Sequence, residues 1–144
     1  MMIKPEDLRI GDLVMISHGC MFPKGTMCAV TEIHPDKEFG YKKGVVSLSA
    51  INDNDDRPWG TWCCNIAGIP ITPEILENNG FEMKEDSIVY SKSKVALKPL
   101  DDNKGYEAGI GNRIFYVKIG DIRYVHELQH ILWVLNMETI LQIR

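Results

Sequence analysis

The residues His126-Glu127-Leu128-Gln129-His130 form the one stretch whose types and spacing could do chemistry. They match the HExxH pattern of zinc metallopeptidases. On a helix, two histidines four residues apart lie side by side, so both imidazoles can reach one zinc ion while the glutamate activates its bound water. The pattern therefore supports a zinc-dependent hydrolase in which His126 and His130 bind the metal and Glu127 is the general base.

A zinc site of this kind needs a third protein ligand, and the sequence does not supply an obvious one. Only Glu138 follows, and it lies close to His130 for the usual downstream glutamate. The HExxHxxGxxH extension is absent. We therefore favour a chain with no catalytic residue, metal or other cofactor, and keep zinc hydrolysis as the alternative.

The same residues belong to a predicted helix over 124–136. Asp121 is expected to cap its first turn, and Asn136 tolerates the left-handed conformation common at helix ends. On a helical wheel the histidines lie opposite the apolar arc and beside Trp133, so we interpret them as an outer face, stacked on Trp133 or covered by another segment. The apolar arc consists of Tyr124, Val125, Leu128, Ile131, Leu132 and Leu135.

Length and composition restrict the class of protein. A chain of 144 residues with 44% hydrophobic residues fits one compact domain or two small subdomains with a shared core. The net charge of −4 argues against nonspecific binding to nucleic acid. Neither a signal-peptide pattern nor a run of about 20 apolar residues is present, so we expect a soluble, cytoplasmic protein without a membrane partner.

Four cysteines occur, at positions 20, 28, 63 and 64, and none forms a CxxC pair. Cytosolic thiols stay reduced, so we expect reduced and mostly buried side chains. The alternative is a structural zinc held by Cys20, Cys28 and one of the adjacent pair, with His18 or His34 as the fourth ligand.

Four strands are predicted in the first half of the chain, over 12–17, 27–34, 45–51 and 59–66, with Pro35 ending the second. The acidic run 52–58 lacks the glycine and glutamate of a calcium loop and is interpreted as a solvated loop. Trp59 and Trp62 could form a ligand platform, although large aromatic residues more often fill the core of a small barrel.

The second half begins with a short helix within 69–81, which Thr72 caps, Pro73 opens and Gly80 ends. A hairpin over 81–91, strands at 95–100 and 112–119, the long helix, and a closing strand at 138–143 are predicted to follow. The GxG pair at 109–111 leads into a strand and not into the helix that a phosphate site needs.

Three segments together resemble a family of small uncharacterised proteins encoded by phages, prophages and other mobile elements of gut anaerobic bacteria. The segments are LRIGDLV at 8–14, IPITPEILENNGF at 69–81 and IRYVHELQHILWVLN at 122–136. Members of that family often carry Gln at the position of Glu127 and sometimes Asn at that of His130, so the resemblance implies that HELQH is a variant of a structural helix. Ile71 and Asp12 depart from the leucine and asparagine of the family pattern.

We therefore predict an α+β fold in two parts: an SH3-like small β-barrel at 1–68, and at 69–144 a short helix and a second β-sheet packed by a C-terminal helix. Whether the two parts share one core is left open. For function we predict a non-enzymatic interaction or assembly module with an unidentified protein partner, acting in a bacterial host cell or in the virion, with self-association left open. The candidate interaction surface comprises Trp59, Trp62, His126, His130 and Trp133.

A further alternative is nucleic-acid binding by the small barrel. It would use a basic, aromatic loop surface, although the acidic balance of the chain argues against it. That surface comprises Lys24, Lys37, Lys42, Lys43, Phe39 and Tyr41.

Overall fold

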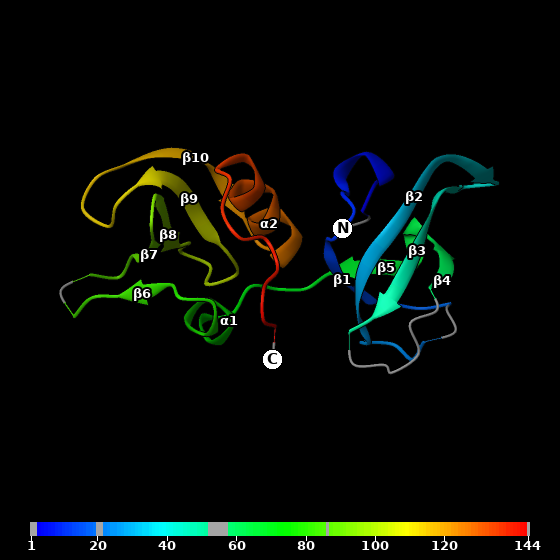
Figure 1. Cartoon of the computed structure of the whole chain (residues 1–144), viewed down its shortest axis with the longest axis horizontal. Helices are drawn as coiled ribbons and strands as arrows, with labels where there is room; N and C mark the ends of the chain where they lie inside the picture. Colours follow the sequence, from blue (N-terminus) through cyan, green and yellow to red (C-terminus); the bar gives the residue numbers. More distant parts are fainter. Residues whose placement is uncertain (1–2, 20–21, 52–57, 86, 144) are drawn as a thin grey trace. The chain divides into compact units, whose positions relative to one another are not determined.

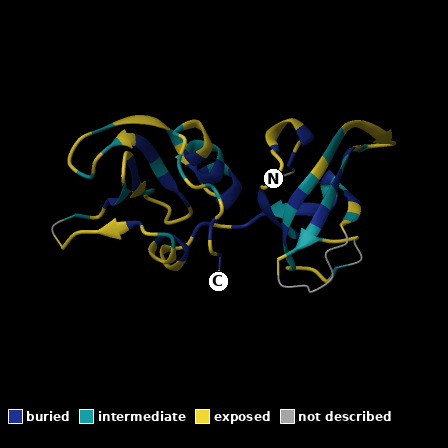
Figure 2. Ribbon diagram, in the orientation of Figure 1, coloured by how far each residue is buried: buried dark blue, intermediate teal, exposed yellow. Residues whose placement is uncertain are grey.

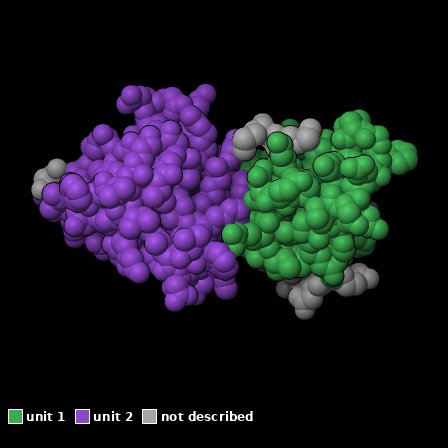
Figure 3. All heavy atoms as spheres, turned by 90° about the horizontal axis from the view of Figure 1, so that it is seen from above, with its two compact units in different colours: residues 1–69 green, residues 70–144 purple. Residues whose placement is uncertain are grey.

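The computed structural model describes residues 3–19, 22–51, 58–85 and 87–143. The chain divides into two compact units, Met1–Ile69 (unit 1) and Pro70–Arg144 (unit 2), which Figure 3 shows in different colours. Each unit contains one five-stranded antiparallel sheet, and unit 2 also contains both α-helices. The predicted α+β class is confirmed.

Unit 1 is a sheet with the strand order β4-β3-β2-β1-β5 (Figure 1). In the part of the chain that the structure describes, no ladder joins β4 to β5, so the sheet is open. Two 3₁₀ turns accompany it, η1 before the first strand and η2 between the last two. The elements are η1 (Pro5–Asp7), β1 (Leu13–Ile16), β2 (Met27–Phe39), β3 (Lys42–Ala50), β4 (Trp59–Trp62), η2 (Cys63–Asn65) and β5 (Ile66–Gly68).

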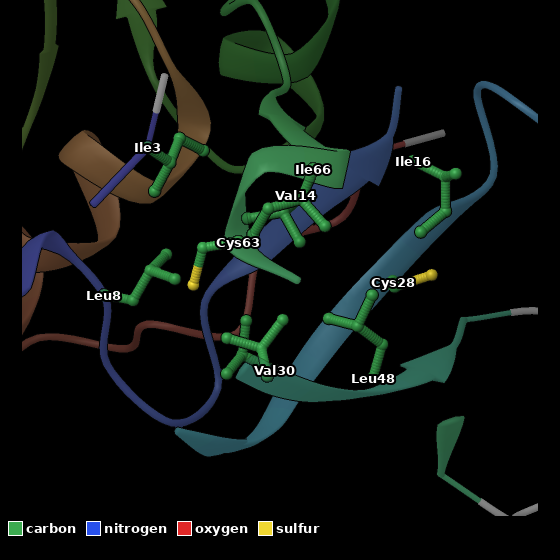
Figure 4. Close-up of a cluster of buried hydrophobic side chains, with 10 residues drawn as sticks. Ile3, Leu8, Val14, Ile16, Cys28, Val30, Leu48, Cys63 and Ile66 are labelled. Carbon is green, nitrogen blue, oxygen red and sulfur yellow. The ribbon is translucent and has the colours of Figure 1, made fainter. Parts of the chain in front are cut away.

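The core of unit 1 forms on one face of this sheet because the strands alternate buried and more exposed residues. Val46 and Leu48 of β3 are fully buried, whereas the alternating residues Val45 and Ser47 are half-buried. Figure 4 shows the side chains that meet there, with Cys28 and Cys63 among aliphatic residues. The cluster comprises Ile3, Leu8, Val14, Ile16, Cys28, Val30, Val46, Leu48, Cys63 and Ile66.

The cysteines that the structure describes carry reduced thiols, as predicted. Cys28 and Cys63 are buried and Cys64 is half-buried. Burial, with smaller contributions from Cys64 and Glu6, raises the pKa of Cys63 to about 11. Cys20 lies outside the described residues.

Two strand predictions in unit 1 are wrong. Pro35 does not end β2, which continues to Phe39. A register shift between His34 and Glu38 takes up the proline, which has no N–H to donate to the ladder. The predicted strand 59–66 is divided by η2, so its two parts pair with different strands: β4 with β3, and β5 with β1. Most of the acidic run 52–58 lies outside the described residues.

Unit 2 is an antiparallel meander with the strand order β10-β9-β8-β7-β6 (Figure 1). Strand β9 is not predicted from the sequence, because two glycines and an alanine weaken its strand pattern. No helix in the described part of the chain is long and apolar enough to cross a membrane. The elements are α1 (Pro73–Asn78), β6 (Glu82–Met83), β7 (Tyr90–Lys92), β8 (Val95–Pro99), β9 (Tyr106–Gly111), β10 (Tyr116–Ile122) and α2 (Val125–Val134).

Helix α1 forms as predicted from its capping residues. The Thr72 hydroxyl accepts a hydrogen bond from the Ile75 backbone nitrogen at 3.2 Å, and Pro73 occupies the first helical position. Ile75 and Leu76 are buried. Gly80 follows with φ of +87°, a conformation that glycine adopts without strain.

Helix α2 is present, but its first turn and its buried face differ from the prediction. Asp121 does not cap it: this residue lies in β10, where its carboxylate is 3.4 Å from Lys118 Nζ. Asn136, with φ of +56°, follows the helix end as predicted. The buried face is rotated from the apolar arc and comprises Val125, His126, Leu128, Gln129 and Leu132.

The rotation is explained by the C-terminal segment, which is irregular and not the predicted strand. It passes alongside α2 towards α1 (Figure 1), and Gln129 Nε2 donates to the Thr139 carbonyl oxygen at 3.0 Å. The Asn79 side chain takes the place of a neighbouring strand: its amide nitrogen donates to the Gln142 carbonyl oxygen at 2.6 Å, and its oxygen accepts from the Gln142 backbone nitrogen at 2.7 Å. Leu141 and Ile143 are buried in consequence.

Candidate functional site

Unit 2 contains a cavity of about 890 Å³, which we call the tyrosine pocket. Its lining comes from segments distant in the sequence: the residues around the start of α1, strands β6 to β9, the turn before β9 and the start of α2. This volume lies within the range of about 300–1,000 Å³ that is usual for ligand sites. Its lining includes Met83, Tyr90, Lys104, Tyr106, Arg123 and Tyr124.

Tyr90 and Tyr106 provide a rigid aromatic part of the pocket. Their rings pack edge to face with centroids 6.2 Å apart, and both residues are buried. Burial raises the pKa of both phenols, and the nearby Glu77 carboxylate raises them further. Both hydroxyls therefore stay protonated at neutral pH and present neutral polar groups.

Pro70, Pro73 and Pro99 add apolar surface to the lining. Pro99 is paired with Tyr106 across β8 and β9, and Pro70 forms an isolated bridge with Tyr124. Proline has a fixed φ, so this surface loses little conformational freedom when a ligand binds.

Arg123 brings a positive charge to the pocket in a fixed position. Its Nη1 donates to the Lys104 carbonyl oxygen at 2.6 Å, and its Nη2 lies 3.0 Å from Asp102 Oδ2. The Lys104 backbone N–H and the Arg123 guanidinium lower the pKa of Asp102, so this carboxylate is ionised at neutral pH. The turn that carries Lys104 and the start of α2 are thus joined through one side chain.

Glu127, the proposed catalytic base of the HExxH pattern, is a helix cap in the structure. Its Oε1 accepts hydrogen bonds from the backbone nitrogens of Arg123 and Tyr124, both at 3.0 Å. These N–H groups precede or begin the helix and have no partner within it, so a side-chain acceptor stabilises them. The carboxylate therefore holds in place two residues that line the pocket.

The two histidines of the pattern extend an aromatic stack from Tyr124. The His126 ring is stacked on the Tyr124 ring with centroids 5.9 Å apart, and the His130 ring meets His126 edge on at 5.9 Å. His126 is 3% exposed and His130 is half-buried, so the helix face that carries them is largely covered, which was one of the two placements considered from the sequence. Among the described residues, no group of three or more His, Cys, Asp or Glu side chains is placed to hold a metal ion.

The other residues of the predicted interaction surface are divided between the two units. Trp133 is 58% exposed on α2 of unit 2, whereas Trp59 and Trp62 belong to β4 of unit 1. Trp59 packs edge on against Phe22, with centroids 6.4 Å apart. The Lys42 ammonium lies 5.9 Å from the centre of the Trp62 ring.

The basic, aromatic surface considered for nucleic acid is partly assembled at the tip of the β2–β3 hairpin. Phe39 and Tyr41 are 74% and 81% exposed there, beside Lys42 and Lys43. Lys24 lies in the segment between β1 and β2, outside this tip.

Two features escaped the sequence analysis altogether. One is the tyrosine pocket, which no local pattern announces because its residues come from separate strands. The other is a set of exposed apolar residues in the β9–β10 hairpin, much of which Figure 2 colours as exposed. These residues are Ile110, Ile114, Phe115, Val117 and Ile119.

Comparisons of the chain with protein-family models, with curated proteins and with solved structures found no match. The function is therefore argued from the geometry of the chain itself.

Proposed function

We propose that this protein is a non-enzymatic interaction module and that the tyrosine pocket of unit 2 is its binding site for a partner protein. The observation that supports this proposal is the pocket itself. Prolines and buried aromatic residues line a cavity of about 890 Å³, and Arg123 is also among the lining residues. A concave apolar surface with a few placed polar groups is the usual form of a binding site. Tyrosine and arginine are also the residue types that contribute most to protein interfaces.

The position of Glu127 supports a binding role over a hydrolytic one. A general base must reach a metal-bound water, whereas this carboxylate oxygen accepts two backbone hydrogen bonds at the start of α2. All three chemically suggestive residues of HELQH then have structural roles: Glu127 caps the helix, and His126 and His130 pack behind Tyr124.

The wider role that we propose is interaction or assembly within a phage or another mobile element. Its support is the resemblance of segments 8–14, 69–81 and 122–136 to that family, and the last two of these segments contribute residues to the pocket. We also propose that unit 1 has the strand arrangement of an SH3-like small barrel, with its sheet open between β4 and β5. The strand order β4-β3-β2-β1-β5 and the 3₁₀ turn between β4 and β5 support this assignment.

A second candidate function is single-stranded nucleic-acid binding at the β2–β3 hairpin. It is favoured by the exposed Phe39 and Tyr41 beside Lys42 and Lys43, because aromatic rings stack on bases while lysines neutralise phosphates. Asp36 and Glu38 in the same hairpin oppose it. Binding to a labelled oligonucleotide should then weaken steeply with salt and with Phe39→Ala.

To test the main proposal, peptides that bind the intact chain are selected from a random library displayed on phage. Their binding is then measured with variants that carry a bulkier side chain inside or outside the pocket. Met83 is 42% exposed and lines the pocket, so the bulkier side chain of Met83→Trp should narrow it and weaken binding of the selected peptides at least tenfold. Ile88→Trp adds the same bulk at a residue that is 61% exposed and outside the pocket lining, and should leave binding unchanged. No enrichment of peptides, or equal binding by both variants, would overturn the proposal.

A further inference from the structure

The charges around the tyrosine pocket differ in sign from the chain as a whole. The protein carries a net charge of −4, yet the charged side chains among the described lining residues are Lys104 and Arg123, both positive. Asp102, which pairs with Arg123, does not belong to the lining. Glu77, whose carboxylate lies near Tyr90 and Tyr106, is also outside the lining. The charged residues of the lining itself are thus positive, and charge complementarity at Arg123 favours an anionic group.

Arg123 is prepared to bind such a group. A guanidinium has five N–H donors, and the bonds to Asp102 and to the Lys104 carbonyl use one from each of two nitrogens. The same two bonds hold the side chain in one orientation, so little conformational freedom is lost when a carboxylate binds. Glycine at position 105 allows the backbone to approach Arg123 closely. A Cβ added there would lie 2.8 Å from the Arg123 Cγ and 2.6 Å from the Ile122 carbonyl oxygen.

The remaining lining residues indicate which other group of the ligand binds next to its anionic group. Tyr90 and Tyr106 line the pocket as buried, neutral aromatic residues, and Tyr124 is held by its stack on His126. Rings of this kind pack best against another aromatic ring or against proline. The volume of about 890 Å³ accommodates a short chain segment and not only one ring.

We propose that the tyrosine pocket binds an extended segment of a partner protein in which an aromatic side chain packs on Tyr90 and Tyr106 and a nearby carboxylate pairs with Arg123. This inference rests on the proposed function and specifies the chemistry of the partner. Lys104 adds long-range attraction for the acidic segment, while Arg123 makes the direct charge-assisted hydrogen bonds.

The test uses four pools of fluorescein-labelled nonapeptides that differ in two features only. One pool contains a central tryptophan with flanking glutamates; the others replace the glutamates by glutamine, replace them by lysine, or replace the tryptophan by alanine. Fluorescence anisotropy with the intact chain should show the tightest binding for the first pool, by about tenfold, because a charge-assisted hydrogen bond to Arg123 is stronger than a neutral one. Binding of the first pool should also weaken as salt is raised.

Two variants identify the residue responsible. Arg123→Gln should remove the preference for glutamate over glutamine, while the hydrogen bond from the backbone nitrogen of residue 123 to Glu127 is retained. Lys98→Gln is the matched control, because Lys98 is an exposed lysine of unit 2 outside the pocket lining, and the preference should persist there. Circular dichroism melting curves check that both variants fold.

The outcomes separate the inference from the proposed function. Equal binding of the glutamate, glutamine and lysine pools, or a preference that survives Arg123→Gln, overturns the inference while pocket binding itself stands. Library selection can also yield peptides whose binding Met83→Trp weakens while none of the four pools binds. This result too overturns the inference and leaves pocket binding intact. Failure of both experiments overturns the inference and the proposed function together.

Discussion

The carboxylate of Glu127 lies 3.0 Å from the backbone nitrogen of Tyr124, three residues before it in the chain. The same oxygen also accepts from the Arg123 nitrogen, so one side chain fixes the junction between β10 and α2. A glutamate that would be a catalytic base in a metallopeptidase therefore acts here on the backbone of its own helix, beside the tyrosine pocket.

Replacement of Glu127 distinguishes these two roles. Glu127→Ala should lower the free energy of unfolding by about 1–2 kcal/mol, because two backbone N–H groups lose their acceptor. Glu127→Gln retains an acceptor oxygen and should lose much less. Urea denaturation measures both. If Glu127 were the base of a zinc hydrolase, the glutamine variant would instead abolish a metal-dependent peptidase activity of the parent chain without a change in stability.

Removal of the Asn79 side chain should release the C-terminal segment. Asn79→Ala deletes both hydrogen bonds to the Gln142 backbone and a third, of 2.7 Å, to the Ile75 carbonyl oxygen. We expect a loss of about 1–3 kcal/mol and faster amide hydrogen exchange over 137–143. Gln142→Ala is the control, since Asn79 contacts only the backbone of that residue; exchange that is equally fast in both variants would contradict this account.

The raised pKa of Cys63 makes stability depend on pH in the alkaline range. Burial lifts the pKa from 9.0 to about 11, so the folded state prefers the protonated thiol. The resulting stabilisation is fully present below pH 9 and is lost as pH rises towards 11, amounting to about 3 kcal/mol for a shift of this size. Unfolding free energies measured from pH 8 to 11 should fall more steeply for the parent chain than for Cys63→Ala, and parallel curves would contradict the prediction.

The close approach of Tyr116 to Gly109 should make Gly109→Ala costly. A Cβ at this position would collide with the Tyr116 ring, whose hydroxyl donates to Glu107 at 2.7 Å. Displacing the ring breaks this bond and should cost about 1–3 kcal/mol. Gly60→Ala in β4 is the matched control, because the nearest atom to its added Cβ is 4.0 Å away. Thermal melts of the two variants should differ clearly, and equal shifts would show that Tyr116 moves without cost.

Local features of this protein could be predicted from its sequence because they depend on neighbouring residues. Thr72 and Pro73 determine where α1 begins, and Asn136 marks the end of α2. The alternation in β1 to β3 likewise requires only one buried sheet face. The same local patterns could not reveal that a bulge accommodates Pro35 within β2, because the bulge depends on pairing with β3.

The tertiary structure alone decided which residues form the pocket and which face of α2 is buried. Tyr90, Tyr106 and Arg123 are distant in the sequence. They line one cavity because strands β7, β8, β9 and β10 pair in one sheet and because α2 starts directly after β10. His126 and Gln129 look like surface residues on a helical wheel, since the wheel contains no information on the C-terminal segment, to which Gln129 donates a hydrogen bond. Periodicity reports the polarity of a face, whereas burial depends on what the rest of the chain places against it.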